Sequence, residues 1–475
     1  MSDLYSPERR TALVLSGAGA DGAYHAGVLR ALHEAGVKID IVCGRGIGAL
    51  GAVFAAVDGG SRLWDAKGLW RTPAVAQLYR WRSALRVLFA VGAAIVGVLV
   101  SPILFLALGI VVYVTGLLFG MAGLDLGMDL LRGYADLLAA AFAPGALPTW
   151  LPRLIALCVI VALIAVGIGL LLAARNTVHR RRSRGSSAWS MISSPIDGRR
   201  ATQHFVNGLW ELLRGGASLK APPAEELSRR YSELLQDNLA QPGFRELLLI
   251  VHDLDARRDV VFGLVREPFR RALFPPPGAS AVRRSEAFDL AGLARDHLVD
   301  VVRGALSIPG LTEPALVRFS ADTYWRGETH RLVDRPESLS RLLEEAAAAG
   351  AEQAIVVSAA TVPPGPHELA RPRMEPLARC SEQTASIESA AVRDAMQHLQ
   401  HRFRAIYDIR AEHNPVGAFD LQGAFDERSD RHHSLAELME RGYHDAYHEF
   451  IDPVVAASGE HLRGAGQSVG GASNA

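Results

Sequence analysis

Two long stretches without any charged residue most constrain what this chain can fold into. They run from Val87 to Leu124 and from Leu154 to Ala174. A helix needs roughly 20 apolar residues to cross the hydrocarbon core of a membrane, and the second stretch fits one crossing. The first is nearly twice as long. It is either one long helix or a hairpin broken near Ser101 and Pro102, because proline removes a backbone donor.

Arginines gather at the outer ends of these two stretches. The positive-inside rule places both outer flanks in the cytoplasm, which requires an even number of crossings. We expect two crossings, or four if the amphipathic stretch 130–142 also inserts. The sequence thus predicts an integral membrane protein with a cytoplasmic soluble domain. The arginines are Arg71, Arg80, Arg82 and Arg86 before the first stretch, and Arg175, Arg180, Arg181, Arg182 and Arg184 after the second.

Charge and cysteine content exclude several classes of protein. The 475 residues carry 50 basic and 50 acidic side chains, a net charge of 0, which argues against nucleic-acid binding through counterion release. The three cysteines form no CxxC pair and no zinc spacing, so we expect a reducing compartment and no disulfide framework.

His444 and His448 lie four residues apart without a third ligand, so a packing helix is expected there. No metal and no cofactor is expected.

The regions outside 66–188 have the pattern of an α/β protein. Short apolar runs at 11–16 and 38–44 each lead through glycines into a helical pattern, which is typical of a parallel, helix-covered sheet. Further downstream we expect a strand hairpin turning near Asp255 and Ala256, a strand at 352–359, and a helix that begins with a capping box at Ser434.

The expected domain organisation is therefore an α/β domain interrupted by an all-α transmembrane insertion. The first part of the soluble domain is 1–65, and the insertion is 66–188, with membrane runs at about 87–121 and 154–174. The second part is 189–462, and 463–475 form a disordered tail rich in small residues.

Two glycine loops follow the first two expected strands. The first contains Gly17, Ala18, Gly19, Asp21 and Gly22, and it turns backbone N–H groups toward the start of a helix, which is a common way to build an anion site. The second has the spacing of a G-x-S-x-G nucleophile elbow, in which a strained strand-to-helix turn lifts the central side chain above the sheet. Its residues are Gly44, Arg45, Gly46, Ile47 and Gly48.

The run LSGAGADGAYHAGVLRALHEAG followed by IVCGRGIGALGAVFAA resembles the start of a patatin-like phospholipase domain. Weaker matches follow in order at ALSIPGLTEP and GAEQAIVVSA, so the resemblance covers roughly 10–62 and 195–460. It implies a parallel-sheet α/β/α domain with an oxyanion loop and a Ser–Asp dyad that hydrolyses lipid esters. The closest description is a bacterial, membrane-anchored member with a degenerate active site.

Three positions depart from the family pattern. Gly46 stands where the nucleophilic serine is expected, and Asp21 replaces the basic residue of the oxyanion loop. The best alignment puts Arg326 at the position of the catalytic acid, with Asp322 or Asp334 as alternative carboxylates. Catalytic residues therefore remain unassigned. The candidate oxyanion or ligand-binding residues are Gly17, Ala18, Gly19, Asp21, Gly22, Gly44, Gly46 and Ile47.

These departures leave three hypotheses for function. The first is a membrane-anchored homologue of lipid acyl hydrolases that is catalytically impaired and binds a lipid or a protein partner at the cytoplasmic membrane face. The second is an active lipid acyl hydrolase with a displaced nucleophile, for which Ser16 and Cys43 are the candidates. The third is a membrane scaffold that uses the domain only for protein interaction. Gly46 favours the first hypothesis over the second, because glycine has no side-chain oxygen that could attack an ester.

Overall fold

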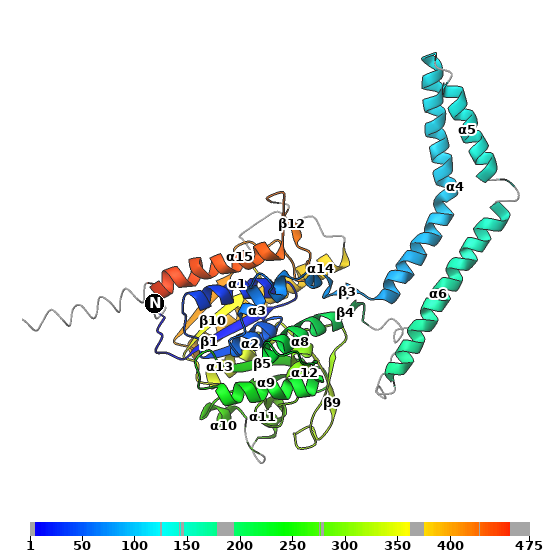
Figure 1. Cartoon of the computed structure of the whole chain (residues 1–475). Coiled ribbons are helices and arrows are strands. Elements are labelled where there is room, and N and C mark those ends of the chain that lie inside the picture. Colours follow the sequence, from blue (N-terminus) through cyan, green and yellow to red (C-terminus); the bar gives the residue numbers. More distant parts are fainter. Residues whose placement is uncertain are drawn as a thin grey trace, which may run out of the picture. The chain divides into compact units, whose positions relative to one another are not determined.

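A computed structural model describes residues 5–123, 126–141, 143, 147–177, 194–274, 276, 280–361, 375–426 and 428–456. The chain forms two compact units (Figure 1). Unit 1 comprises Met1–Arg80 and Ile196–Ala475, and unit 2 comprises Trp81–Pro195. The expected tail at 463–475 and the arginines at 180–184 lie outside the described residues.

Unit 1 is built on a nine-stranded, mostly parallel sheet. The strands β11, β10, β1, β2 and β5 run parallel to one another, and β6 returns antiparallel from β5. β7 pairs with β6, while β9 pairs with both β5 and β8. In sheet order the bounds are β11 Ala405–Arg410, β10 Gln353–Ser358, β1 Thr11–Gly17, β2 Ile41–Gly46, β5 Glu246–Asp253, β6 Arg258–Leu264 and β7 Ala287–Asp289, with β8 at Ala315–Arg318 and β9 at Thr329–Val333.

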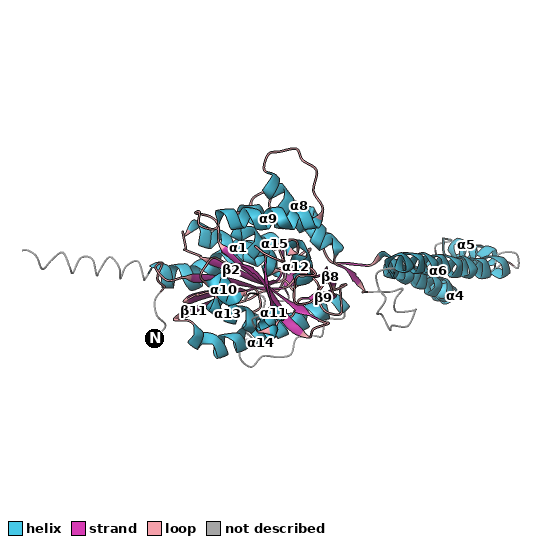
Figure 2. Cartoon of the chain, turned by 90° about the horizontal axis from the view of Figure 1, so that it is seen from below, coloured by secondary structure: helices cyan, strands magenta, loops and turns pink. Residues whose placement is uncertain are grey.

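Helices cover both faces of this sheet, as Figure 2 shows. Alternate residues of a strand point to opposite faces, so Leu13 and Leu15 of β1 enter one core while Ala12 and Val14 enter the other. The first face carries α1 Asp21–Glu34, α2 Gly48–Ala56, α8 Arg199–Arg214, α9 Ala224–Asn238, α12 Leu298–Ala305 and α15 Leu435–Ala446. The second carries α10 Phe269–Leu273, α13 Ser338–Ala348 and α14 Pro376–Leu399.

Shorter elements complete unit 1. They are α3 Ser61–Trp64, α11 Ala281–Glu286, β4 Ile196–Asp197, β12 Ala424–Asp426 and β13 Arg431–His433, three single 3-10 turns at Leu69–Arg71, Pro73–Gln77 and Gln400–Arg402, and a π-helical stretch at Tyr447–Ala456; β3 is Arg80–Trp81, at the boundary with unit 2.

The structure confirms the elements expected for the soluble part. The two strand–glycine–helix units are β1–α1 and β2–α2, and the hairpin turning near Asp255 is β5–β6. The strand expected at 352–359 is β10, preceded by α13. Ser434 caps α15 with both halves of the capping box formed: its side chain accepts the Glu437 N–H, and the Glu437 side chain accepts the Ser434 N–H.

Unit 2 is all-helical. Its helices are α4 Ser83–Met121, α5 Leu126–Ala141 and α6 Leu147–Thr177. α4 continues without interruption past Ser101 and Pro102, so the long-helix alternative is correct and the broken hairpin is wrong. α5 packs along α4, where the Tyr134 hydroxyl donates to the Phe105 carbonyl and a Cβ added to Gly109 would lie 3.0 Å from the Tyr134 ring.

Within the described residues, one helical stretch is long and apolar enough to cross a membrane by length and composition. It is Ile103–Met121, with a mean hydropathy of 2.5 and 6% of its window buried. The apolar segments Leu85–Gly97 and Arg153–Ile168 are shorter.

The boundary between the units lies later in the chain than the sequence analysis placed it. Residues 66–80, which we expected in the insertion, belong to unit 1. Trp70, Val75 and Tyr79 are buried in its core, and the Tyr79 hydroxyl donates to the Leu306 carbonyl at 3.0 Å. An apolar, aromatic segment that ends in arginines resembles a membrane flank in sequence, but here it covers the core of unit 1.

Candidate functional site

The two glycine loops meet at the carboxyl-terminal edge of the sheet. β1 and β2 are neighbouring parallel strands, and their last residues, Gly17 and Gly46, pair directly. The Ile47 N–H donates to the Gly17 carbonyl at 2.9 Å, which ties the start of α2 to the end of β1. Ligands of open α/β sheets bind outside this edge, and the two loops predicted from sequence lie side by side there.

The nucleophile position is adapted to glycine. Gly46 has a φ of 55°, a left-handed conformation that glycine adopts without a steric penalty. A Cβ built on Gly46 would lie 2.1 Å from the Gly17 carbonyl oxygen and 3.0 Å from Oδ2 of Asp334. A Cβ at position 46 therefore requires the backbone at Gly17 to shift.

The loop expected to stabilise an oxyanion is closed by its own acid. The Ala18 N–H donates to Oδ2 of Asp21 at 2.8 Å. Asp21 is buried at the first turn of α1, where a negative charge interacts favourably with the helix dipole. The Asp21 carboxylate thus occupies the donor that a substrate oxyanion would need.

The other residues predicted for the site serve close packing. A Cβ on Gly19, whose φ is 54°, would overlap the Ala418 carbonyl oxygen, which accepts the Ala20 N–H at 2.8 Å. A Cβ on Gly22 would meet the ring of Trp70, and one on Gly44 would overlap the backbone of Ala49. Gly44 therefore lets α2 approach β2, while Gly19 and Gly22 make room for the Ala418 carbonyl and the Trp70 ring.

Arg45 holds the centre of the site together. Its side chain is fully buried, and its Nη1 lies 3.2 and 3.1 Å from Oδ1 and Oδ2 of Asp334. Its Nη2 donates to Oε1 of Glu388 on α14, and its Nε donates to the Ser16 hydroxyl at 3.1 Å. Ser16 in turn donates to Oε2 of Glu388 at 3.3 Å. β1, β2, β9 and α14 are thus joined by one buried polar network.

This network contains more acid than base. Burial raises the pKa of Asp334 to about 7, with Glu388 adding to the rise and Arg45 opposing it. Burial likewise raises the pKa of Asp21 to about 7, against the Ala18 hydrogen bond. The pKa of Glu388 is also raised, mainly by burial. One guanidinium faces three carboxyl groups, so the site does not favour another negative charge.

The carboxylate next to Gly46 is Asp334, so the alignment that put Arg326 there needs correction. Asp334 directly follows β9, whose pairing with β5 brings it to the elbow. Arg326 precedes β9, and a strand of five residues at about 3.3 Å each separates the two positions by roughly 15 Å. Arg326 is exposed in the turn between β8 and β9, as is Asp322.

Neither substitute nucleophile is free to react. The Ser16 side chain is buried, and its hydroxyl is held between Arg45 and Glu388. Cys43 is also buried, and burial raises the pKa of its thiol far above its usual range, which keeps it protonated. A thiol attacks as the thiolate, so Cys43 has neither the access nor the charge state that attack requires.

The histidine pair at the carboxyl end lies at a change of helix type. His444 is in the last turn of α15 and His448 is in the following π-helical stretch, and both are exposed. Asp445 between them accepts a hydrogen bond from Tyr24 at 3.0 Å. In the part of the chain that the structure describes, no three His, Cys, Asp or Glu side chains converge on a metal position.

Sequence reasoning missed two partners of this site. Arg45 had been treated only as a spacer within the elbow, although a charged residue within the apolar strand IVCGRG needs a buried counter-charge. Glu388 lies 343 positions further along the chain, and no local pattern connects it to the elbow.

The family model and the similar proteins all point to one protein family. The family model "Patatin-like phospholipase" matches residues 13–334, from β1 to the acid beside Gly46. Patatin-like phospholipase domain-containing protein 6 of Mus musculus is 54% identical over 60 residues, which is 12% of this chain and 4% of that protein. Triacylglycerol lipase ptl3 of Schizosaccharomyces pombe is 53% identical over 47 residues, 10% of each chain.

Lysophospholipase nte1 of Aspergillus fumigatus is 50% identical over 48 residues, 10% of this chain and 3% of that one. The matches thus span a tenth or less of these relatives. A solved structure, VipD from Legionella pneumophila, aligns over 93% of this chain and 67% of that chain with 14% identity and a TM-score of 0.28, too low to support any argument. The family model covers well over half of the chain, and the chain belongs to the patatin-like phospholipase family.

Proposed function

We propose that this protein is a membrane-anchored member of the family that has lost ester hydrolysis and binds a lipid or a protein partner at the cytoplasmic membrane face. The observation that carries the proposal is Gly46. It lacks the oxygen that would act as nucleophile, and a side chain at this position would require the backbone at Gly17 to shift.

Acyl transfer by a Ser–Asp dyad needs a nucleophilic oxygen, a base to take its proton, and donors for the oxyanion. Position 46 supplies no oxygen. The base candidate, Asp334, is paired with Arg45 instead of facing a hydroxyl. The Ala18 donor is engaged by Asp21. Each of the three requirements fails for a separate structural reason, which supports loss of hydrolysis over a displaced nucleophile.

Hydrolysis is tested directly on the purified full-length protein in detergent. We expect no turnover of short-chain p-nitrophenyl esters or lysophospholipid, and no labelling by a serine-reactive fluorophosphonate. A patatin-like hydrolase with an intact G-x-S-x-G motif serves as the positive control. Labelling or turnover that co-purifies with the chain would refute the loss of hydrolysis: if it persists in an Asp334→Asn variant, another nucleophile acts without Asp334, and if it is lost there, Asp334 takes part in catalysis with another nucleophile.

Membrane anchoring is supported by the apolar, exposed surface of unit 2. Large apolar side chains are exposed along α4 and α6, among them Leu106, Ile110, Leu163 and Leu171. Exposed apolar surface on this scale is unfavourable in water and suits a lipid environment. Loss of the protein from the membrane fraction after carbonate extraction would contradict this part of the proposal.

The topology is tested by cysteine labelling in a Cys158→Ala, Cys380→Ala background, in which the buried Cys43 remains unreactive. Asp129→Cys on α5 and Lys220→Cys in unit 1 are both placed at exposed positions. Two crossings predict labelling from opposite sides of the membrane by an impermeant maleimide. Labelling of both from one side would refute the two-crossing topology.

A further inference from the structure

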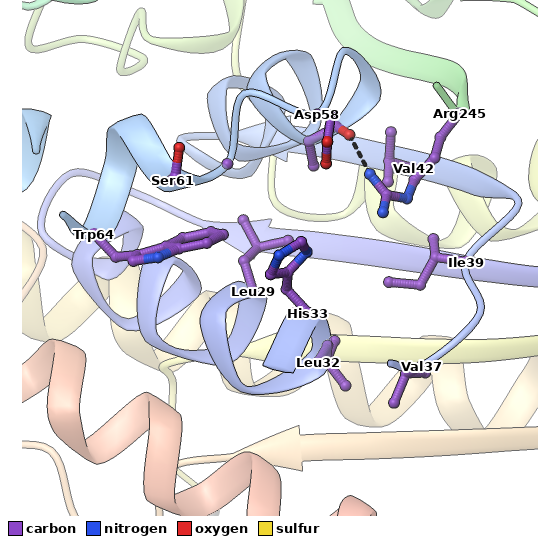
Figure 3. A pocket seen from close by; sticks show the side chains of 12 residues that line it. Leu29, Leu32, His33, Val37, Ile39, Val42, Asp58, Ser61, Trp64 and Arg245 are labelled. Carbon is purple, nitrogen blue, oxygen red and sulfur yellow. Dashed lines mark hydrogen bonds between the residues drawn. The ribbon is translucent and has the colours of Figure 1, made fainter. Parts of the chain in front are cut away.

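A pocket of about 170 Å³ lies in unit 1 at the edge of the sheet opposite the elbow. Its walls come from the end of α1, the segment entering β2, the segment from α2 to α3, and Arg245 just before β5 (Figure 3). Val42 lines it near the amino end of β2, whereas Gly46 ends the same strand. The pocket is therefore separate from the site described above.

The pocket has an apolar floor, an aromatic wall and a polar side formed by Asp58, Ser61 and Arg245. The rings of His33 and Trp64 lie with centroids 6.0 Å apart and planes at 45°, and Figure 3 shows both facing the hollow. The apolar lining residues are Leu29, Leu32, Val37, Ile39, Val42 and Ala55. An apolar cavity of about 150 Å³ accommodates a benzene ring, so this pocket has room for a ring or a short chain.

Arg245 supplies one cationic group to this apolar pocket. Its Nη1 donates to the Ala55 carbonyl at 2.7 Å and to the Gly243 carbonyl at 3.3 Å. Among the described residues no carboxylate lies within ion-pair distance of its guanidinium; Asp58, which also lines the pocket, interacts with the charge only from further away. Burial lowers the pKa of Arg245, and Asp58 opposes this only in part.

A half-buried cation without an ion-pair partner, beside an apolar hollow, is the arrangement that binds an amphipathic anion. The carboxylate of a ligand would offset the charge of Arg245 through a charge-assisted hydrogen bond. The apolar body of the same ligand would lie between the His33 and Trp64 rings and the aliphatic floor, with Ser61 at the rim.

We propose that this pocket binds a small organic carboxylate with an apolar ring or short chain, about eight to ten non-hydrogen atoms in all. The guanidinium of Arg245 recognises the carboxylate, and the aromatic wall recognises the apolar body. This binding is independent of ester hydrolysis and of the network around Arg45.

The test uses the full-length protein in detergent and benzoate as the probe, with benzyl alcohol as its neutral counterpart. Saturation-transfer NMR and calorimetric titration measure binding, with protein-free micelles as the blank. We expect benzoate to bind at least tenfold more tightly than benzyl alcohol. We also expect Arg245→Met to abolish that preference. The matched control is Arg270→Met, because Arg270 is a half-buried arginine that pairs with Asp289 away from the pocket.

Because Arg245→Met also removes the hydrogen bond to Ala55, a second variant keeps the test decisive. Ser61→Trp places a large ring at the exposed rim of the pocket and leaves Arg245 untouched. It should reduce benzoate binding at least tenfold with no change in the unfolding temperature. Three results would overturn the proposal. They are equal binding of benzoate and benzyl alcohol, benzoate binding that is unchanged in Ser61→Trp, and no benzoate binding at millimolar concentrations.

Discussion

The substitution Gly46→Ser tests whether the turn after β2 can still accommodate a serine side chain. In Gly46→Ser, the new Cβ would lie 2.1 Å from the Gly17 carbonyl oxygen, whereas ordinary contacts begin at 3.4 Å. The backbone must therefore move by about an ångström at the junction of β1 and β2. This movement would break the hydrogen bond from the Ile47 N–H to the Gly17 carbonyl. A left-handed φ costs an L-residue roughly 1–2 kcal/mol, and overpacking costs about 1–3 kcal/mol more. We expect the free energy of unfolding to fall by roughly 2–5 kcal/mol.

Two control variants separate the contributions. Gly46→Ala carries the same Cβ without the hydroxyl and should lose as much stability as the serine variant. Gly36→Ala has a similar φ of 66° but nothing within 4 Å of its Cβ, so it should lose only the conformational part, about 1–2 kcal/mol. The difference between the two alanine variants measures the overlap with Gly17.

The assay combines chemical denaturation of the full-length protein with fluorophosphonate labelling. The reasoning predicts that Gly46→Ser is destabilised and stays unlabelled, because the donor of Ala18 remains occupied by Asp21. A serine variant that is as stable as the wild type and reacts with the probe would refute the account of the closed elbow.

Three further predictions concern the buried network and a helix cap. Asp21→Asn keeps an acceptor for the Ala18 N–H and removes a carboxyl group whose pKa burial raises from 3.8 to about 7. Between these pH values the folded wild type holds a proton that the unfolded chain has released, so Asp21 lowers stability progressively from about pH 4 to pH 7, and the loss levels off above 7. The variant should therefore gain stability over the wild type at pH 8, by up to about 4 kcal/mol, and little at pH 4, in paired denaturation curves. Arg45→Met leaves Asp334 and Glu388 without their counter-charge and should cost about 3–5 kcal/mol at pH 8 and less at pH 5; an equal loss at both pH values would contradict the charge argument. Ser434→Ala should cost about 1 kcal/mol by removing the cap of α15, measured as a shift in denaturation midpoint against Ser218→Ala, a change at an exposed position, as the control.

The local parts of the fold were predictable because their signals are local. The glycines after β1 and β2, the β5–β6 hairpin and the cap at Ser434 each depend on residues a few positions apart. The uninterrupted α4 was not settled by the sequence, because Pro102 within the uncharged run also allowed a broken hairpin.

The acid beside Gly46 was harder to assign, because its position depends on long-range pairing. β9 is short and pairs with both β5 and β8, and no sequence pattern fixes which of several nearby charged residues ends at the elbow. Glu388 reaches the site from α14 through tertiary packing alone. Arg45 was visible as a charge within an apolar strand, and it would have pointed to buried carboxylates.

The interruption of unit 1 by unit 2 has a consequence for how the protein is made. β2 pairs with β5, and β1 lies between β2 and β10, so the first two strands stay without half of their neighbours until the chain beyond unit 2 has left the ribosome. The thermodynamic cost is small, because doubling a closed loop costs only about 0.6 kcal/mol. The kinetic cost is larger, since two apolar strands with open edges await their partners throughout the synthesis of unit 2. We therefore expect chaperone dependence during translation to concentrate on the first 80 residues.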